Sequence, residues 1–415
     1  MHGVLMWDKR GMDEIVDRIR DLEEYYPDSA GLSSAHFAPT SPFYTWEDAR
    51  CSPEFLASLP TPISGPISSG FGCATLFWLA AHDRPYLKEF STAGTVADFV
   101  VCLLTRPLYA PPKVSMTVHN AVSWGYFDAE TSRWERSLFG APKFPHRLLP
   151  RPIVPVGSIV GDVKHSILGL RKGVKVFAAV GDFQASLLAA VGPPEAGLSS
   201  RSAFINVGTS AQLATLLAKK DVPDLKTYPG VTMFPFSETH VAVVAASLNG
   251  GNVLNQLAEM FQEIRSAFGR RVDLETTWSV LLKESSRQEE ATAAETAAAA
   301  SPADAMLKVK PTLYGERHDP GATASISGIT ASNLSMGSLM RATCRGIIDN
   351  LLEMMPLSLL KANGVQRVIA SGGVFEKNPV MLEEAKKAFE GMELVLCDAT
   401  MDASYGAALF TTLGK

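Results

Sequence analysis

The chain contains two short apolar runs that each end in a glycine turn. Residues 174–180 lead into Gly181-Asp182, and residues 203–207 lead into Gly208-Thr209-Ser210. Apolar runs of this length that are bounded by glycine are typical of buried strands. A carboxylate thus follows one strand and a possible phosphate cradle follows the other. Phosphoryl transfer needs little more from a protein, because it depends on positioning the nucleophile and stabilising charge.

Strand-like and helical patterns alternate along both halves of the chain, which predicts an α/β fold. A chain of 415 residues is too long for a single hydrophobic core, which predicts two domains. Apolar residues at three- and four-residue spacing over Val253–Phe268 predict an amphipathic helix. The other expected elements are strands at 211–217, 241–248 and 366–370, helices over 75–105, over 183–191 and from 379, and an irregular loop over 37–68.

Composition restricts the partners and the compartment. With 43 acidic and 38 basic side chains and a net charge of -5, the sequence has no basic surface for nucleic acid or anionic lipid. The charged residues Asp8, Lys9 and Arg10 stand where a signal peptide would have its apolar segment. No apolar run reaches membrane-spanning length. The five cysteines are scattered and predict buried free thiols. We expect a cytoplasmic protein with a small-molecule partner, whose oligomeric state the sequence leaves open.

One segment belongs to no predicted core. Residues 284–305 are acidic and rich in alanine, and they contain no large apolar side chain. We expect a solvated helix or a flexible insertion without chemistry of its own.

Asp182 has two interpretations. A residue between a strand and a helix could serve only as the N-cap of that helix. Gly181 allows a sharp turn that would instead present the carboxylate at the C-terminal edge of the strand, where open α/β sheets bind ligands. The position alone leaves both interpretations open.

The glycine turns are similarly ambiguous. The segment 208–210 could be a plain hairpin turn, or its N–H groups and the Thr209 hydroxyl could form an anion nest. The segment 249–252 could be a strand-to-helix turn or a close approach to a ligand at a helix N-terminus. Ser371-Gly372-Gly373 repeats this choice, and Asn378 has a good structural explanation as an N-cap before Pro379. The segment 315–320 has the composition of a charged turn.

Taken in order, these segments resemble the FGGY carbohydrate kinase family over nearly the whole chain except 284–305. Within the family, the runs at 71–79, 123–127, 245–254 and 315–318 are most similar to the members that phosphorylate the seven-carbon ketose sedoheptulose. The matching segments are Met-His-Gly at 1–3, Trp-Glu-Asp-Ala-Arg at 46–50, Asn-Ala-Val-Ser-Trp at 120–124, Gly-Asp-Phe-Gln-Ala-Ser at 181–186, Gly-Thr-Ser at 208–210, Gly-Glu-Arg-His at 315–318, Gly-Gly at 372–373 and Asp-Ala-Ser-Tyr-Gly-Ala-Ala at 402–408.

The resemblance implies a two-domain actin-like (ribonuclease H-like) sugar kinase fold that uses ATP and Mg²⁺. It implies a sugar-side domain over 1–187 and a nucleotide-side domain over 188–415. Asp182 matches the catalytic base that takes the proton from the sugar hydroxyl. The other matches are Gly208, Thr209, Gly251, Asn255, Gly373 and, more loosely, Asn378 on the nucleotide side, and Met1, His2 and Asn120 on the sugar side; the metal ligands are unknown.

The sequence departs from the family pattern at two places. Val118 stands where relatives often have an acidic residue. Family members also begin with a strand and an Asp-x-Gly-Thr phosphate loop before the Met-His-Gly turn, whereas here that turn comes first. We therefore expect a first domain without its opening strands, an incomplete gene model or short isoform, and little kinase activity from this chain alone.

Two alternatives stay open beside sedoheptulose phosphorylation. A xylulose or ribulose kinase of the same family would need the same Asp182 and Gly208-Thr209 with a differently shaped sugar pocket. A catalytically impaired sugar- or nucleotide-binding remnant would not need Asp182.

Overall fold

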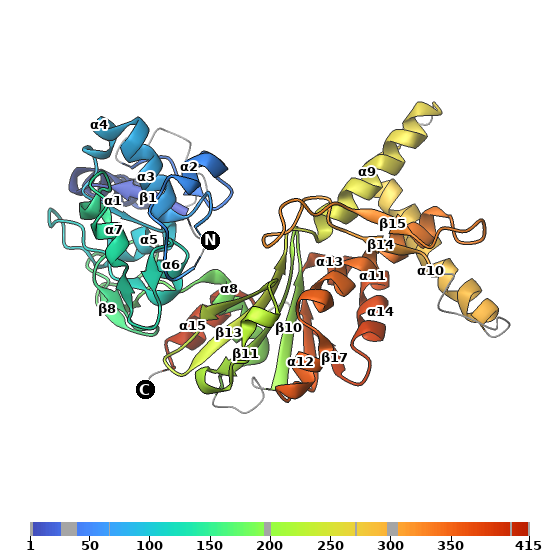
Figure 1. Cartoon of the computed structure of the whole chain (residues 1–415). Helices are drawn as coiled ribbons and strands as arrows, with labels where there is room; N and C mark the ends of the chain where they lie inside the picture. Colours follow the sequence, from blue (N-terminus) through green and yellow to red (C-terminus); the bar gives the residue numbers. More distant parts are fainter. Residues whose placement is uncertain are drawn as a thin grey trace. The chain divides into compact units, whose positions relative to one another are not determined.

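The computed structural model describes residues 3–25, 40–65, 67–194, 201–269, 272–296, 306–398 and 401–413 (Figure 1). The chain divides into two compact units. Unit 1 comprises Met1–Ala189, Pro235–Glu238 and Asp402–Lys415, and unit 2 comprises Ala190–Phe234 and Thr239–Met401. The chain therefore crosses between the units after residues 189, 234, 238 and 401. The functional assignment of 1–187 to the sugar and 188–415 to the nucleotide stays a prediction.

Unit 1 is built around the strand β1 (Gly3–Trp7), in which all five residues are buried. This strand pairs antiparallel with β2 (Tyr44–Thr45) and with β3 (Thr92–Gly94). Its continuous apolar sequence fits a strand that is covered on both faces. The other elements of unit 1 are α1 (Lys9–Tyr25), α2 (Pro53–Ala57), α3 (Gly72–His82), α4 (Arg84–Leu87), α5 (Val96–Thr105), β4 (Met116–Thr117), α6 (Val118–Val122), β5 (Phe127–Asp128), β6 (Arg133–Trp134), α7 (Arg136–Phe139), β7 (Ile153–Val154), β8 (Ile159–Asp162), β9 (Lys175–Phe177), α8 (Asp182–Val191) and α15 (Ala403–Phe410).

Unit 2 contains a six-stranded sheet in the order β12-β13-β11-β10-β16-β17. The strand β10 (Ser202–Val207) pairs antiparallel with β11 and parallel with β16, and β11 pairs antiparallel with β13. Strands β10, β13 and β16 therefore run in one direction and end at the same edge. The other elements of unit 2 are β11 (Ala211–Ala218), β12 (Val231–Pro235), β13 (His240–Ser247), α9 (Gly251–Ala267), α10 (Leu274–Thr296), β14 (Lys308–Lys310), β15 (Ser325–Ser327), α11 (Met336–Met354), α12 (Leu357–Ala362), β16 (Arg367–Ser371), α13 (Gly373–Lys377), α14 (Pro379–Ala388) and β17 (Glu393–Leu396).

The core of unit 2 lies between this sheet and its helices. Buried side chains of β10, β11 and β13 pack with those of α11 and α14. Figure 1 shows β13, β11 and β10 running side by side, with α10 and α11 as neighbouring helices. None of the helices in the described ranges combines the length and the apolar content that a membrane crossing needs.

Most elements expected from the sequence are present. Strands β10, β11, β13 and β16 and helices α8, α9 and α14 confirm those predictions. The single helical region expected over 75–105 is wrong, because Asp83 caps the new helix α4, Pro85 lies in its first turn, and β3 follows before α5. The loop expected over 37–68 contains β2 and α2. Residues 37–39 and 66 lie outside the described residues.

The expectation for residues 284–305 is wrong at its start. The expected helix is present, since α10 continues through Thr296, but Ser285 is fully buried against α11 and not solvated. The Ser285 carbonyl oxygen accepts hydrogen bonds from Arg341 Nε at 3.1 Å and Nη2 at 3.0 Å. The absence of large apolar side chains did not predict exposure here, because a small side chain can be buried where two helices approach closely. Residues 297–305 lie outside the described residues.

The cysteine prediction is confirmed in the main. Cys51, Cys73, Cys102, Cys344 and Cys397 are all free thiols, and only Cys397 is half-buried instead of buried.

Candidate functional site

Three backbone turns meet at the shared edge of the unit 2 sheet. They follow β10 at 208–210, β13 at 248–251 and β16 at 372–373. The main-chain N–H of Gly251 donates to the Gly208 carbonyl oxygen at 2.7 Å, and that of Asn252 donates to the Thr209 carbonyl oxygen at 3.1 Å. We call these three turns the glycine wall. The wall brings together three segments that are distant in the sequence.

Glycine is required at several positions of this wall. A Cβ on Gly251 would lie 2.6 Å from the Gly208 carbonyl oxygen, and a Cβ on Gly250 would lie 2.5 Å from the Ser210 carbonyl carbon. Gly372 has φ of +102°, and a Cβ there would lie 2.5 Å from the Val207 carbonyl oxygen. These separations are too short for any larger residue without movement of the backbone.

Two other glycines of the wall face open space. A Cβ on Gly208 or on Gly373 would meet no atom within 4 Å. Within the described residues, the main-chain N–H groups of Thr209 and Ser210 donate no hydrogen bond, and Thr209 is exposed. Helix α9 also begins at Gly251, which places the positive end of its dipole at the wall. Free N–H groups beside a helix N-terminus suit an anionic group.

The remaining nucleotide-side candidates differ in their surroundings. Asn255 lies one turn into α9 from Gly251, is half-buried, and its Nδ2 donates to Glu259 Oε1 at 2.6 Å. The Asn378 side chain is 3% exposed and accepts from the Met381 N–H at 3.1 Å as the N-cap of α14. Its Nδ2 donates to Cys344 Sγ at 3.4 Å. The structure therefore favours the N-cap interpretation, and a nucleotide contact by Asn378 stays a prediction.

Glu316 is a buried carboxylate that supports the glycine wall. It lies in the segment 315–320, which has the composition of a charged turn. Glu316 is 3% exposed, and its Oε1 accepts from Ser247 Oγ at 2.6 Å, Asn350 Nδ2 at 2.7 Å and Asn249 Nδ2 at 3.1 Å. The Asn249 Nδ2 also donates to the Gly315 carbonyl oxygen at 2.8 Å. Asn249 stands next to Gly250, so Glu316 fixes the start of the wall. The Gly-Glu-Arg-His match in the sequence was the available signal.

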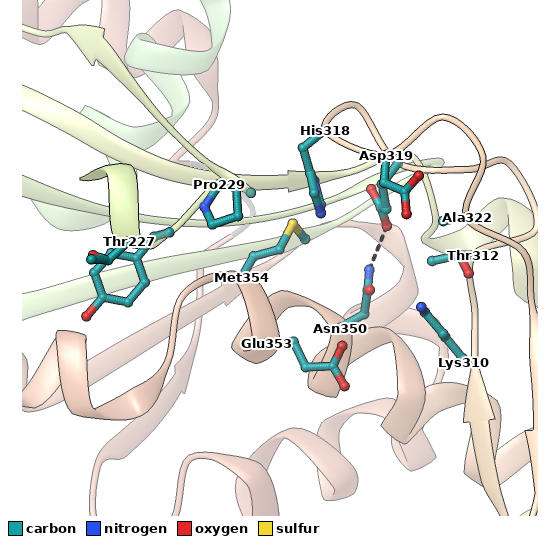
Figure 2. Close-up of a pocket in the computed structure, with 13 residues that line it drawn as sticks. Thr227, Pro229, Lys310, Thr312, His318, Asp319, Ala322, Asn350, Glu353 and Met354 are labelled. Atoms are coloured by element: carbon teal, nitrogen blue, oxygen red, sulfur yellow. Dashed lines mark hydrogen bonds between the residues drawn. The ribbon is translucent and has the colours of Figure 1, made fainter. Parts of the chain in front are cut away.

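A polar cavity of about 260 Å³ lies beside this network in unit 2. Figure 2 shows Lys310, His318, Asn350 and Glu353 around it. Its lining also includes Glu316 but none of the predicted site residues. The glycine wall and this cavity are therefore different features.

In unit 1, Asp182 is the first residue of α8 and is exposed. Two of the three residues before it, Ala179 and Gly181, are held by side chains of β4 and α6. Thr117 Oγ1 donates to the Ala179 carbonyl oxygen at 2.7 Å, and Asn120 Nδ2 approaches the same oxygen at 3.4 Å. The Gly181 N–H donates to His119 Nδ1 at 3.4 Å. The turn thus presents the carboxylate at an exposed position on a fixed backbone.

Two buried groups behind this turn have strongly shifted pKa values. Burial lowers the pKa of His119 to about 4, so its ring is neutral at pH 7. Burial raises the pKa of Asp98 to about 6, although hydrogen bonds from Thr95 and the Asn120 amide favour its charged form. Asn120 is itself 6% exposed. In this structure Asn120 lies between Asp98 and the Ala179 carbonyl, so a sugar contact by Asn120 stays a prediction.

Met1 and His2, the other predicted sugar contacts, lie outside the described residues. The described ranges contain no group of three or more His, Cys, Asp or Glu side chains placed to hold a metal ion.

Comparisons with known proteins give one consistent group of relatives. The chain is 36% identical to mouse (Mus musculus) sedoheptulokinase in an alignment that is 417 residues long and covers 99% of this chain and 79% of the relative. It is 38% identical to human (Homo sapiens) sedoheptulokinase over 371 residues, which cover 88% of this chain and 71% of the relative. No family model matches the chain.

Solved sugar kinases have a similar fold. Xylulose kinase from Rhodospirillum rubrum superposes with a TM-score of 0.70 at 19% identity, covering 100% of this chain and 74% of that one. Glycerol kinase from Plasmodium falciparum, solved with ADP, gives a TM-score of 0.62 at 15% identity, with coverage of 99% and 73%.

Proposed function

Because the chain belongs to the sedoheptulokinases of the FGGY carbohydrate kinase family, we propose that it transfers the terminal phosphoryl group of ATP to sedoheptulose. The actin-like α/β fold expected for this family is confirmed. The observation that carries the proposal is the glycine wall, in which Gly208, Gly251 and Gly373 come together with unused N–H groups beside the start of α9.

The wall is the proposed nucleotide site. Gly208 and Gly373 leave space for a ligand, and the Thr209 N–H and hydroxyl are available to phosphate oxygens. Gly251 contributes the N-terminus of α9, and Asn255 lies on the next turn of the same helix. Bound ATP would supply the phosphoryl group together with Mg²⁺, a cation that usually reaches kinase sites through substrate phosphates and one or two carboxylates. The residues present therefore fit a polyphosphate.

Asp182 is the proposed general base. Its exposed carboxylate would accept the proton of the attacking sugar hydroxyl, a role worth about 10²–10⁴-fold in rate. Met1, His2 and Asn120 are the proposed sugar contacts. The product would be sedoheptulose 7-phosphate, an intermediate of the pentose phosphate pathway.

The alternative substrate is a five-carbon ketose. The solved xylulose kinases share the fold, but their identity of 16–19% says nothing about the substrate of this chain. The two curated sedoheptulokinases are twice as similar in sequence. This difference favours the seven-carbon sugar.

A substrate panel tests the proposal. The full-length protein would be assayed with ATP and Mg²⁺ on sedoheptulose, xylulose and ribulose, with ADP release as the readout. We expect kcat/KM for sedoheptulose to exceed that of either pentulose by about 10-fold or more. A reversed preference would assign a pentulose kinase. Ligand-specific thermal stabilisation without turnover would instead assign a binding protein.

The cytoplasm is the proposed compartment. The five free thiols fit a reducing environment. The proposed partner is a small sugar.

A further inference from the structure

The backbone that leads into Asp182 is fixed by contacts within unit 1. Gly181 is enclosed on two sides, since a Cβ there would lie 2.1 Å from Gln184 Oε1 and 3.4 Å from His119 Cβ. The Gln184 side chain is 6% exposed, and its Nε2 lies 3.5 Å from the Pro235 carbonyl oxygen. The position of Asp182 therefore depends on what His119 and Gln184 contact.

His119 connects this turn to a second segment of unit 1. One ring nitrogen, Nδ1, receives the Gly181 N–H at 3.4 Å, and the other, Nε2, lies 2.9 Å from the Phe236 carbonyl oxygen. A carbonyl can only accept, so Nε2 must carry the proton and Nδ1 must be the acceptor. A neutral ring in this single tautomer satisfies both neighbours, and burial keeps the ring neutral.

Two aromatic side chains complete the pocket around the ring. Phe410 of α15 lies edge-on to His119 with ring centroids 5.3 Å apart, and Phe236 lies 5.3 Å from Phe410. His119, Phe236 and Phe410 are all at most 3% exposed. This packing fixes the ring plane and excludes water from the two hydrogen bonds. With only 3% of its surface exposed, His119 is too deeply buried to contact a substrate directly.

We propose that His119 is a positioning residue for Asp182: its neutral ring, protonated on Nε2, holds the Gly181 N–H and the Phe236 carbonyl together and so fixes the turn that presents the carboxylate. This inference rests on the proposed role of Asp182 as the base. It does not make His119 a participant in proton transfer.

Two variants separate hydrogen bonding from packing. His119→Gln can keep both contacts, because its amide oxygen can accept from Gly181 and its amide nitrogen can donate to Phe236. His119→Leu fills similar space without either hydrogen bond. In the full-length protein we expect His119→Leu to lower kcat by about 10- to 100-fold, since small misplacements of a reacting group have effects of this size. The KM for ATP should stay within about 2-fold, because Asp182 takes no part in ATP binding under the proposed function. His119→Gln should return kcat to within about 5-fold of the parent.

The outcomes distinguish this inference from the proposed function. Normal kcat in His119→Leu, with Asp182→Asn inactive, would overturn the positioning role and leave the base assignment intact. Normal turnover in Asp182→Asn would overturn the base assignment itself. If His119→Leu does not fold, the imidazole ¹⁵N spectrum of the unaltered protein decides. A neutral Nε2-protonated ring at pH 7 supports the proposal, and an Nδ1-protonated or charged ring overturns it.

Discussion

The main-chain N–H of Gly251 donates a 2.7 Å hydrogen bond to the carbonyl oxygen of Gly208. This bond joins the start of α9 to the turn after β10, and the carbonyl lies 2.6 Å from where a Cβ of Gly251 would stand. The two segments can approach this closely only because residue 251 has no side chain. Gly208 and Gly373, in contrast, face open space, because a Cβ on either would meet no atom within 4 Å.

Gly251→Ala should therefore disturb the wall itself. The added methyl group must push α9 away from the 208–210 turn, because its obstacle is backbone and not a flexible side chain. We expect a lower melting temperature and weaker ATP binding by at least about 10-fold, since positioned N–H groups are lost. Gly373→Ala is the matched control, because its methyl group meets no protein atom within 4 Å. It should keep the melting temperature and weaken ATP binding alone. Unchanged ATP affinity in both variants, measured by titration calorimetry, would place the nucleotide elsewhere.

Asp182→Asn should separate chemistry from binding. The amide keeps the shape of the side chain and its capacity to cap α8, but it cannot accept the proton of the sugar hydroxyl. We expect kcat to fall by about 100-fold or more with ATP affinity largely kept. Turnover near that of the parent would return Asp182 to the role of an N-cap.

The stability of unit 1 should depend on pH through His119. Its pKa is lowered from 6.5 to about 4 by burial, so between these values the unfolded chain binds a proton that the folded chain does not. The stabilising contribution of neutral His119 to the free energy of unfolding is therefore complete above about pH 6.5. It falls by about 1.4 kcal/mol for each pH unit as the pH falls toward 4. His119→Gln removes this dependence.

Urea unfolding at pH 7 and pH 5 measures the effect. The parent should lose about 2 kcal/mol more than His119→Gln over this interval. Asp98 acts in the opposite direction, because its raised pKa of about 6 removes stability as the pH rises, but it is present in both proteins and cancels from the difference. An equal loss in both proteins would show that folding does not lower the pKa of His119.

Arg341 should be one of the most sensitive positions of unit 2. It is 6% exposed and donates to Glu384 Oε1 at 2.7 Å and to Glu383 Oε2 at 2.9 Å, besides the Ser285 carbonyl. Arg341→Leu removes one cation from buried Glu384, which keeps Arg345 and Lys387. It also takes two donors from the Ser285 carbonyl oxygen, and we expect a loss of about 2–3 kcal/mol in the free energy of unfolding. The exposed pair Arg10–Glu14 is the control, since Arg10→Ala should cost less than about 1 kcal/mol. Similar effects from both variants in urea titrations would contradict the buried network.

The sequence predicted the strands and helices whose pattern is local. Strands β10, β13 and β16 are apolar runs bounded by turns, and α9 has a regular apolar spacing, so neighbouring residues suffice to recognise them. Strand β1 was not predicted, because it follows directly on the chain start and has no preceding turn signal. The burial of Ser285 was missed because it depends on Arg341 and α11, which are distant in sequence.

For the candidate site, the sequence likewise indicated the local turns but not the residues that support them. Glycines at 208, 251 and 373 were identified from their turns, and the structure brings their segments together. Glu316 and His119 were not identified as supporting residues, because their roles arise from partners such as Asn249 and Phe236 that only the fold places beside them.

The discontinuous make-up of unit 1 has a consequence during protein synthesis. A ribosome that has made residues 1–189 has made His119 and Asp182, but neither Phe236 nor Phe410, which enclose the His119 ring. Phe410 is translated only after every residue of unit 2, because that unit ends at Met401. Domains generally fold as units, the N-terminal one first as the chain emerges. Here the unit that emerges first waits for the last helix, so a nascent chain holds the proposed base on an unfinished support until α15 docks.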